Sequence, residues 1–466
     1  MSKFDEIKIP ESIDELTKKA MKKGADYKKK RKYKKIMIAS FTTLIIGTGI
    51  IGASLTNPAI ADSIPMIQEI VDYFSHNEKS LYKSDKDDLE NLGKDLNLKA
   101  EDKGIEFTID SVSVDDNYIT VFYTVKSDKN IKEINKHYKD PYFASPTISS
   151  AYIGGKNIIP AGLVEHEATY ISDKELKGIQ KIDISYTDIK NNEEIEFHVN
   201  EIFEKEGNWK ISTKVDKSKA ISKTHNYKVN KNFKFKETLD YNGKKRDVKH
   251  KVNIEKVIIS PLANKILINE KINKSFKGWE PIMGNRFALF DENSKSLDVV
   301  DKGETGVDPR TGIATNSYEF LKVDKDTKSL TLVPISYDEN IKDKMLKPQS
   351  IDNLPIVFET SKYGKVVIED IQITDKEIRF TYYKDGVVRG YPHLYFFDEN
   401  DNEIQFDIHL KESLDRHTGR YTTIFDIGNS KKNTSKIKDI KRVSTYTDNS
   451  MNLLYDQQMK FDLVKK

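Results

Sequence analysis

Twenty consecutive uncharged residues near the N-terminus constrain this chain more than any other feature. Residues 36–55 read IMIASFTTLIIGTGIIGASL and contain no Asp, Glu, Lys or Arg. As an α-helix rising about 1.5 Å per residue, they would span about 30 Å, which is the thickness of the hydrocarbon layer of a bilayer. The sequence therefore predicts one transmembrane helix over residues 36–55, rather than a buried core helix, which would carry polar residues among the apolar ones.

A basic block directly before this segment predicts the orientation. Residues 28–35 read KKKRKYKK, and basic residues beside a membrane span are retained in the cytoplasm. We therefore expect a cell-membrane protein that crosses once, with residues 1–35 in the cytoplasm and the C-terminal bulk outside. Cleavage after Ala61 is an alternative, because Ala59-Ile60-Ala61 has the small-x-small form of a signal-peptide site, although the leading region and the apolar run are both long for one.

The cytoplasmic segment contains one predicted amphipathic helix, over residues 10–23. Pro10 suits a first helical turn, and Ser12 with Glu15 has the spacing of a capping box. About thirty-five residues cannot build a core of their own, so a partner protein or the bilayer surface must cover the apolar face. A disordered basic tail that only sets the topology is the alternative. The predicted contact residues are Ile9, Ile13, Leu16 and Ala20.

Charge and cysteine content exclude several classes of function. Residues 1–35 carry 13 Lys and Arg against 6 Asp and Glu, so the rest of the chain has a net charge of −4 within the overall +3. A mildly acidic outer part gives no reason to expect nucleic acid as a partner, because phosphates need a clustered basic face. The chain has no cysteine, which excludes disulfides, thiolate metal sites and cysteine nucleophiles. Its Lys, Ile and Asn usage is typical of secreted proteins of low-GC Gram-positive bacteria.

Residues 56–103 are predicted to form a helical stalk, in which Leu89, Leu92 and Leu96 would lie on one helix. From Gly104 the apolar period changes to two, which is typical of antiparallel strands.

One strand–turn–strand phrase occurs three times after the stalk, and its copies begin at Ile109, Ile254 and Ile368. These starts lie 145 and 114 residues apart, which is domain spacing and not the short period of a solenoid. We therefore expect a mainly β fold with three tandem antiparallel β-sandwich-like (Ig-like) domains. The expected domains are residues 104–219, 224–340 and 362–466.

Two further phrases support the duplication. Residues 290–297 (FDENSKSL) and 397–404 (FDENDNEI) each read as a hairpin turn between apolar strands. Residues 182–186 (IDISY), 334–337 (PISY) and, more loosely, 443–446 (VSTY) are predicted to be equivalent strand ends.

The sequence offers no catalytic constellation, and we expect no enzyme activity and no cofactor. The nine histidines do not form an HExxH pattern, and neither a GxSxG elbow nor a phosphate-binding GxxxxGK[ST] loop occurs. The segment from Asp398 to Asn402 resembles the start of a calcium loop, but Glu403 stands where the turn glycine belongs and His409 where the bidentate glutamate belongs. It is predicted to be a plain hairpin turn, so no metal site is expected. Trp209 and Trp279 are interpreted as core or interface residues.

Several of these segments, in this order, resemble a family of Gram-positive single-pass membrane proteins known as domain of unknown function 4179, often followed by a second uncharacterised β domain. The resemblance rests on residues 9–15 (IPESIDE), the basic block and apolar segment, residues 57–65 (NPAIADSIP), residues 104–112 (GIEFTIDSV) and residues 121–125 (VFYTV). Residues 208–216 (NWKISTKVD) look like the strand that closes the first outer domain.

Members of this family often look like partners of extracytoplasmic-function sigma factors and are sometimes labelled anti-sigma factors. The resemblance implies that the helix carrying Ile9, Ile13 and Leu16 binds a sigma factor in the cytoplasm, while the outer domains sense a signal from an unknown extracellular ligand or wall component. This chain departs from many anti-sigma factors in its short cytoplasmic part and its lack of cysteine. The alternative is an extracellular binding or structural surface protein whose tandem β domains act without a cytoplasmic partner.

Overall fold

A computed structural model describes most of the chain beyond residue 85. The expected cytoplasmic helix, the transmembrane segment and the first thirty residues of the stalk lie outside the described residues. Within the described part, no helix is long and apolar enough to cross a membrane. The described ranges are residues 86–136, 146–158, 164–241, 244–272, 286–308, 311–321, 323, 327–338, 340–390, 392–406, 409–426 and 436–464.

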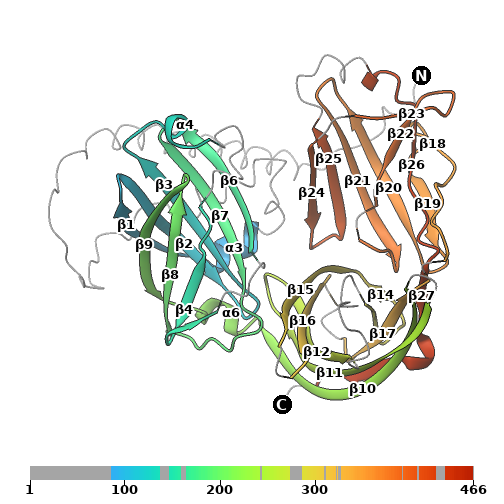
Figure 1. The fold of residues 1–466 in the computed structure, drawn as a ribbon, viewed down its shortest axis with the longest axis horizontal. Helices are drawn as coiled ribbons and strands as arrows, with labels where there is room; N and C mark the ends of the chain where they lie inside the picture. Colours follow the sequence, from blue (N-terminus) through green and yellow to red (C-terminus); the bar gives the residue numbers. More distant parts are fainter. Residues whose placement is uncertain are drawn as a thin grey trace, which may run out of the picture. The chain divides into compact units, whose positions relative to one another are not determined.

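The chain folds into antiparallel sheets, so the predicted mainly β class is confirmed. The sheets form three pairs, and each pair encloses a hydrophobic core to which both of its sheets contribute. We call these pairs sandwich 1, sandwich 2 and sandwich 3 (Figure 1).

Sandwich 1 contains a five-stranded sheet of order β1-β2-β3-β7-β6 and a four-stranded sheet of order β5-β4-β8-β9. Helix α3 (Lys86–Leu92) precedes it, α4 (Ile131–Ile134) follows β3, and α6 (Ser218–Ile221) leads into sandwich 2. Its strands are β1 (Lys94–Asp102), β2 (Ile105–Val114), β3 (Tyr118–Ser127), β4 (Ser150–Ile153), β5 (Lys156–Asn157), β6 (Val164–Ser172), β7 (Glu175–Asp183), β8 (Glu194–Ile202) and β9 (Lys205–Lys214).

Sandwich 2 contains one sheet of order β10-β11-β12-β16-β15 and a second sheet of order β14-β13-β17-β27. Strand β28 also pairs with β17 in the second sheet. The short 3₁₀-helix η4 (Tyr455–Gln457) joins the last two strands. Its strands are β10 (His225–Tyr241), β11 (Lys244–Ile259), β12 (Asn264–Ile272), β13 (Phe287–Asp291), β14 (Ser296–Leu297), β15 (Val299–Val307), β16 (Ile313–Phe320), β17 (Ser329–Tyr337), β27 (Met451–Leu453) and β28 (Met459–Asp462).

Sandwich 3 contains sheets of order β19-β20-β21-β25-β24 and β18-β26-β22-β23. Its strands are β18 (Gln349–Ser350), β19 (Ile356–Ser361), β20 (Gly364–Ile373), β21 (Glu377–Gly386), β22 (Tyr395–Phe397), β23 (Glu403–Ile404), β24 (His409–Asp415), β25 (Arg420–Asp426) and β26 (Arg442–Ser444).

The five-stranded sheets of the three sandwiches share one strand order. The phrase repeated in the sequence forms β2–β3, β11–β12 and β20–β21, which are the second and third strands of each five-stranded sheet. A β-bulge interrupts the second strand at the same place each time, and its extra residue is acidic. In each copy its carboxylate accepts a hydrogen bond from another strand of the same sheet. The pairs are Asp110 with Thr124, Glu255 with Asn269, and Glu369 with Arg420.

The hairpin phrase is also repeated in three dimensions. Strands β13–β14 and β22–β23 pair around turns that Asp291 and Asp398 close by accepting backbone N–H groups. Ser294 and Asp401, at the same place in each turn, both adopt a left-handed backbone with φ of 64° and 63°. The third phrase is not equivalent in all copies, because residues 182–186 begin at the end of β7, whereas β17 and β26 correspond to β8.

Three details differ from expectation. Leu96 lies in β1 and not in a stalk helix, because residues 94–102 pair with β2 as the first strand of sandwich 1. The C-terminal strands β27 and β28, expected with the third domain, pair with β17 of sandwich 2. In an immunoglobulin fold the second and fifth strands pair, whereas here the second strand lies between the first and third.

The C-terminal strand predicts a test of this topology. Phe461 on β28 is 1% exposed and packs in the core of sandwich 2. We expect Phe461→Ala to lower the free energy of unfolding by about 3–5 kcal/mol, because it removes a buried aromatic ring. Val464→Ala, at a residue that is 60% exposed, is the control and should change it by less than about 0.5 kcal/mol. Urea unfolding followed by circular dichroism measures both changes. Equal effects would contradict the placement of β28 in the core of sandwich 2.

Candidate functional site: the junction of the sandwiches

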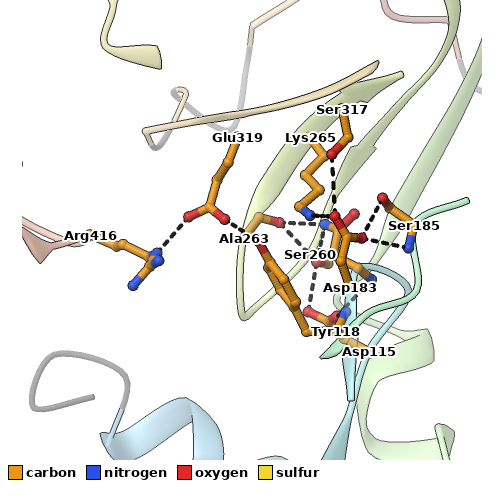
Figure 2. A network of polar contacts seen from close by, with 11 residues as sticks. Asp115, Tyr118, Asp183, Ser185, Ser260, Ala263, Lys265, Ser317, Glu319 and Arg416 are labelled. Atoms are coloured by element: carbon orange, nitrogen blue, oxygen red, sulfur yellow. Dashed lines mark hydrogen bonds and ion pairs between the residues drawn. The ribbon is translucent and has the colours of Figure 1, made fainter. Parts of the chain in front are cut away.

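The residues predicted to contact a cytoplasmic partner, Ile9, Ile13, Leu16 and Ala20, lie outside the described residues, so that prediction remains untested. Within the described part, polar side chains from all three sandwiches meet in one buried network (Figure 2). This network is the candidate functional site that follows from the structure.

The network begins where two equivalent turns touch. The β2–β3 turn closes with a hydrogen bond from Asp115 N to Tyr118 O, and the β11–β12 turn closes in the same way from Ser260 N to Ala263 O. The fully buried Asp115 side chain joins them. Its Oδ1 accepts the N–H groups of Asn117 and Tyr118, and its Oδ2 accepts the Ser260 hydroxyl at 2.7 Å and the Leu262 N–H at 2.9 Å.

Asn117 strengthens the contact between the turns. Its Nδ2 donates to Ser260 Oγ and to the Ala263 carbonyl, each at 2.8 Å. Both side chains are buried, so these bonds form without competition from water.

A buried ion pair lies beside the turns. Lys265 of β12 is 1% exposed, and its Nζ donates to Asp183 Oδ2 at the end of β7. Ser317 of β16 donates to the same oxygen at 3.2 Å. The other oxygen, Asp183 Oδ1, accepts the Ser185 hydroxyl at 2.6 Å and its N–H at 2.9 Å. Sandwiches 1 and 2 therefore share one neutralised charge pair whose carboxylate is well supplied with donors.

The third sandwich joins through Glu319 of β16. Arg416, in the β24–β25 hairpin turn, donates Nε to Glu319 Oε1 at 2.6 Å, and the Tyr118 hydroxyl donates to Oε2. The ammonium groups of Lys181 and Lys265 each lie 4.0 Å from the centre of the Tyr118 ring, where the negative face of the ring attracts a cation. One tyrosine thus connects cations and a carboxylate from different sandwiches.

Burial and charge shift the two carboxyl groups in opposite directions. Burial raises the pKa of Asp115 above its usual range, although four donors oppose this effect. Burial would also raise the pKa of Glu319, but the charges of Arg416, Lys181 and Lys265 outweigh it and hold that pKa far below its usual range. Glu319 is therefore the firmly ionised anion of the junction.

An apolar cluster covers the polar contacts on one side. Leu89 and Leu92 of α3 pack with Tyr118, Phe122 and Ile179 of sandwich 1, and the cluster extends to Ala220, Leu262 and Ala263. Ser113 Oγ donates to the Leu89 carbonyl at 2.8 Å, and His417 of sandwich 3 lies 3.5 Å from Asp88. Helix α3 therefore contacts both sandwich 1 and sandwich 3.

A second contact joins sandwiches 2 and 3. Asp298, between β14 and β15, accepts the Lys384 ammonium at 3.3 Å and the Tyr421 hydroxyl. The Lys384 Nζ also lies 4.5 Å from the centre of the Tyr421 ring. Val300 and Leu321 of sandwich 2 pack against the core of sandwich 3.

Another buried charged cluster lies inside sandwich 2. The fully buried His250 ring is placed between two carboxylates, with Nδ1 2.6 Å from Glu270 Oε1 and Nε2 2.9 Å from Glu237 Oε1. Arg286 also donates to Glu237 Oε1, and Phe235 stacks on the imidazole at 4.1 Å between ring centres. If His250 is protonated, the two carboxylates of Glu237 and Glu270 are balanced by the imidazolium and the Arg286 guanidinium.

This geometry favours the charged form of His250, because only an imidazolium can donate from both nitrogens. Burial would lower the pKa of His250, but the hydrogen bonds and charges of Glu237 and Glu270 outweigh it and raise that pKa. The carboxylates lie on opposite sides of the ring and do not converge on one point. Among the described residues, no group of three or more His, Asp or Glu is arranged to hold a metal ion.

The sequence did not predict either cluster. The partners at the junction are far apart in the chain, such as Asp115 and Ser260, which are 145 residues apart. The one available signal was the acidic and polar content of turns between strongly apolar strands, which usually marks only a solvated turn. The arrangement offers no exposed nucleophile with a base, and what it does is connect three sandwiches through charges that need one another.

The junction predicts a large cost for neutralising its anion. We expect Glu319→Gln to lower the free energy of unfolding by about 3–5 kcal/mol, because it leaves the buried Arg416 contact without its counter-charge and removes the anion near Lys181 and Lys265. The matched control is Glu369→Gln, which breaks the more exposed Glu369–Arg420 pair and should cost at most about 1 kcal/mol. Urea unfolding gives both values, and a similar small cost for the two variants would show that Glu319 does not hold the junction.

The buried histidine predicts a pH dependence with a definite sign. The pKa of His250 is raised in the folded state, so its stabilisation is fully present below the unfolded pKa of about 6.5 and is lost as pH rises through the folded pKa. We expect the difference in unfolding free energy between wild type and His250→Gln to be largest near pH 6. As the pH rises from about 6.5 to the pKa of His250 in the folded state, this difference should fall by up to about 1.4 kcal/mol per pH unit.

Unfolding curves at a series of pH values measure this difference. His393→Gln, at an exposed histidine outside the junction, is the control for general effects of pH. A difference that grows with pH would contradict the imidazolium assignment.

Comparison with known proteins identifies two regions of the chain. No curated protein matches it. A solved structure described as the conserved domain protein from Bacillus anthracis is similar at 17% identity, covering 59% of this chain and 88% of that chain with a TM-score of 0.38. Residues 224–360 match the family of unknown function DUF5643. Residues 28–127 match the domain of unknown function DUF4179, so the chain carries the domain that its sequence resembles, followed by a second uncharacterised family.

Proposed function

We propose that this protein is a membrane-anchored regulator whose cytoplasmic helix binds a sigma factor and whose outer sandwiches receive a signal. The observation that carries the proposal is the extent of the DUF4179 match. It begins at Lys28, the first residue of the basic block, and ends at Ser127, the last residue of β3. The family unit therefore joins the basic block, the apolar segment and the first strands of sandwich 1 in one piece, as a device linking two sides of a membrane would require.

The junction supports a sensing role for the outer part. Helix α3 directly follows residues 56–85, which connect it to the apolar segment, and it packs on the outer face of sandwich 1. Its Asp88 also lies near His417 of sandwich 3. A ligand that binds sandwich 2 or 3 and changes these contacts would change the forces on α3. Coupling of this kind requires only that the ligand bind the two arrangements with different affinity.

The second candidate is an extracellular binding or structural protein that needs no cytoplasmic partner. The size of the outer part favours it, because three sandwiches joined by buried ion pairs offer a large surface for a ligand without the N-terminal segment. On this view the basic N-terminal segment sets only the topology.

A crosslinking pull-down from native membranes tests the proposal. We expect the intact protein to recover a sigma factor, and an Ile13→Asp, Leu16→Asp variant to recover at least about tenfold less, because a carboxylate on the apolar face of the helix would be buried unpaired. The matched control is Lys18→Asn, Lys22→Asn, which changes the net charge by the same amount on the opposite helix face and should leave recovery unchanged. The basic block of residues 28–35 remains intact in both variants.

Two outcomes would count against the regulator. Recovery of no sigma factor by any form would sink it, and so would equal recovery by all forms. If every form brings down the same wall or surface partners and nothing cytoplasmic, the extracellular binding role is supported instead.

A further inference from the structure

The outer face of the β10–β11–β12 sheet carries an unusual row of like charges. Lys234 of β10, Lys251 of β11 and Lys271 of β12 are direct cross-strand partners. Lys236 and Lys249 form the next row. All five are exposed, and we call them the lysine face.

The strand period explains why these lysines share one surface. Successive side chains on a strand point to opposite faces, and Phe235, His250 and Glu270 beside them are buried in sandwich 2. Neighbouring strands lie about 4.8 Å apart, and residues i and i+2 about 7 Å apart. The five ammonium groups therefore occupy a strip about three strands wide and two rows long (Figure 1 shows β10, β11 and β12 side by side).

The three-lysine row Lys234–Lys251–Lys271 contains no acid of its own. Two acids lie near it on the same face: Asp247 pairs with Lys236 at 2.6 Å, and Glu255 accepts a hydrogen bond from Asn269 in the adjacent row. The carboxylates on the buried side, Glu237 and Glu270, are already balanced by His250 and Arg286. Like charges directly opposite one another destabilise a sheet. In sandwich 1 the equivalent three strands instead mix signs, with Glu101, Glu106 and Lys126 in one row.

The surroundings of the lysine face identify the kind of anion it fits. The adjacent row across the three strands is Asn232, Asn253 and Asn269, and Thr238 lies beyond the second row of lysines. Asn253 donates to Asn232, Asn269 to Glu255 and Thr238 to Asp247. Each amide group has a second N–H, which can donate to a phosphate or polyol oxygen. The rows contain no aromatic side chain on which a base would stack, which disfavours single-stranded nucleic acid. They also contain no apolar side chain that would insert into a bilayer.

We propose that the lysine face binds a linear phosphodiester polymer with a polyol backbone, of the poly(glycerol phosphate) type. Successive phosphates of the polymer lie along the strip and pair with ammonium groups from three strands, displacing counterions. This binding goes beyond the proposed regulator role, because it involves the outer part alone. Failure of the sigma-factor pull-down would leave it unaffected.

The test measures polymer binding by the full chain reconstituted in nanodiscs of uncharged phospholipid, with fluorescent poly(glycerol phosphate) as the probe. The variant Lys234→Gln, Lys251→Gln, Lys271→Gln removes the three-lysine row. The matched control, Lys126→Gln, Lys129→Gln, Lys132→Gln, removes the same charge from exposed positions of sandwich 1. A third variant replaces the row with arginine and keeps its charge.

We expect the glutamine row variant to bind at least tenfold more weakly at about 0.1 M salt, the sandwich 1 control to stay within twofold, and the arginine variant to bind as the wild type does. The slope of log K against log salt concentration should become shallower by about 2, since each phosphate contact contributes about 0.7 to 0.9. Circular dichroism and unfolding midpoints confirm that each variant is folded.

Three results would overturn the proposal. The first is no binding by the wild type, and the second is an equal loss in both glutamine variants, which would indicate only general attraction by net charge. The third comes from competition with phosphatidylglycerol vesicles at equal phosphate concentration. If the vesicles displace the probe better than unlabelled polymer does, the lysine face docks on a membrane and not on a polymer.

Discussion

Glu319 is the anion on which the junction of the three sandwiches depends. A carboxylate that is 2% exposed remains charged only if cations stand close by, and Arg416, Lys181 and Lys265 supply them from all three sandwiches. Because each sandwich contributes one of these cations, separating any sandwich from the junction would remove a positive charge from beside Glu319. The charges add little net stability compared with apolar contacts, but they make one set of contacting surfaces much more favourable than others.

The repeated strand pair supplies the turns of this junction, and the different residues in each turn give the copies different roles. The turn between the second and third strands closes with the same backbone hydrogen bond at Asp115, Ser260 and Thr374. Asp115 and Ser260 face each other and are buried, whereas Thr374 is exposed and bonds only within its own turn. The same turn geometry therefore presents an acceptor at Asp115 and a donor at Ser260, whereas the Thr374 side chain bonds within its own turn.

The sequence predicted what depends on local period and failed where distant segments meet. Alternation of apolar residues and the repeated phrases located the strand pairs β2–β3, β11–β12 and β20–β21, because a pleated strand with one buried face leaves that pattern. The charged residues of 94–102 hid an edge strand, since its period is weak. The return of Phe461 to sandwich 2 had no local signal, because an apolar strand fits any open sheet edge. Buried ion pairs such as Lys265–Asp183 likewise read as ordinary surface charges until both partners are placed.

Strand β12 shows how one surface can serve both the junction and an outer ligand. Lys265, Leu267, Asn269 and Lys271 alternate along the same outer face. At one end the face is covered, and Lys265 pairs with Asp183. Six residues further, about 20 Å along the strand, Lys271 is exposed in the lysine face. An anion bound there would act on the strand that anchors Lys265, so the charge that fixes the junction and the charge that attracts a polymer belong to one mechanical element.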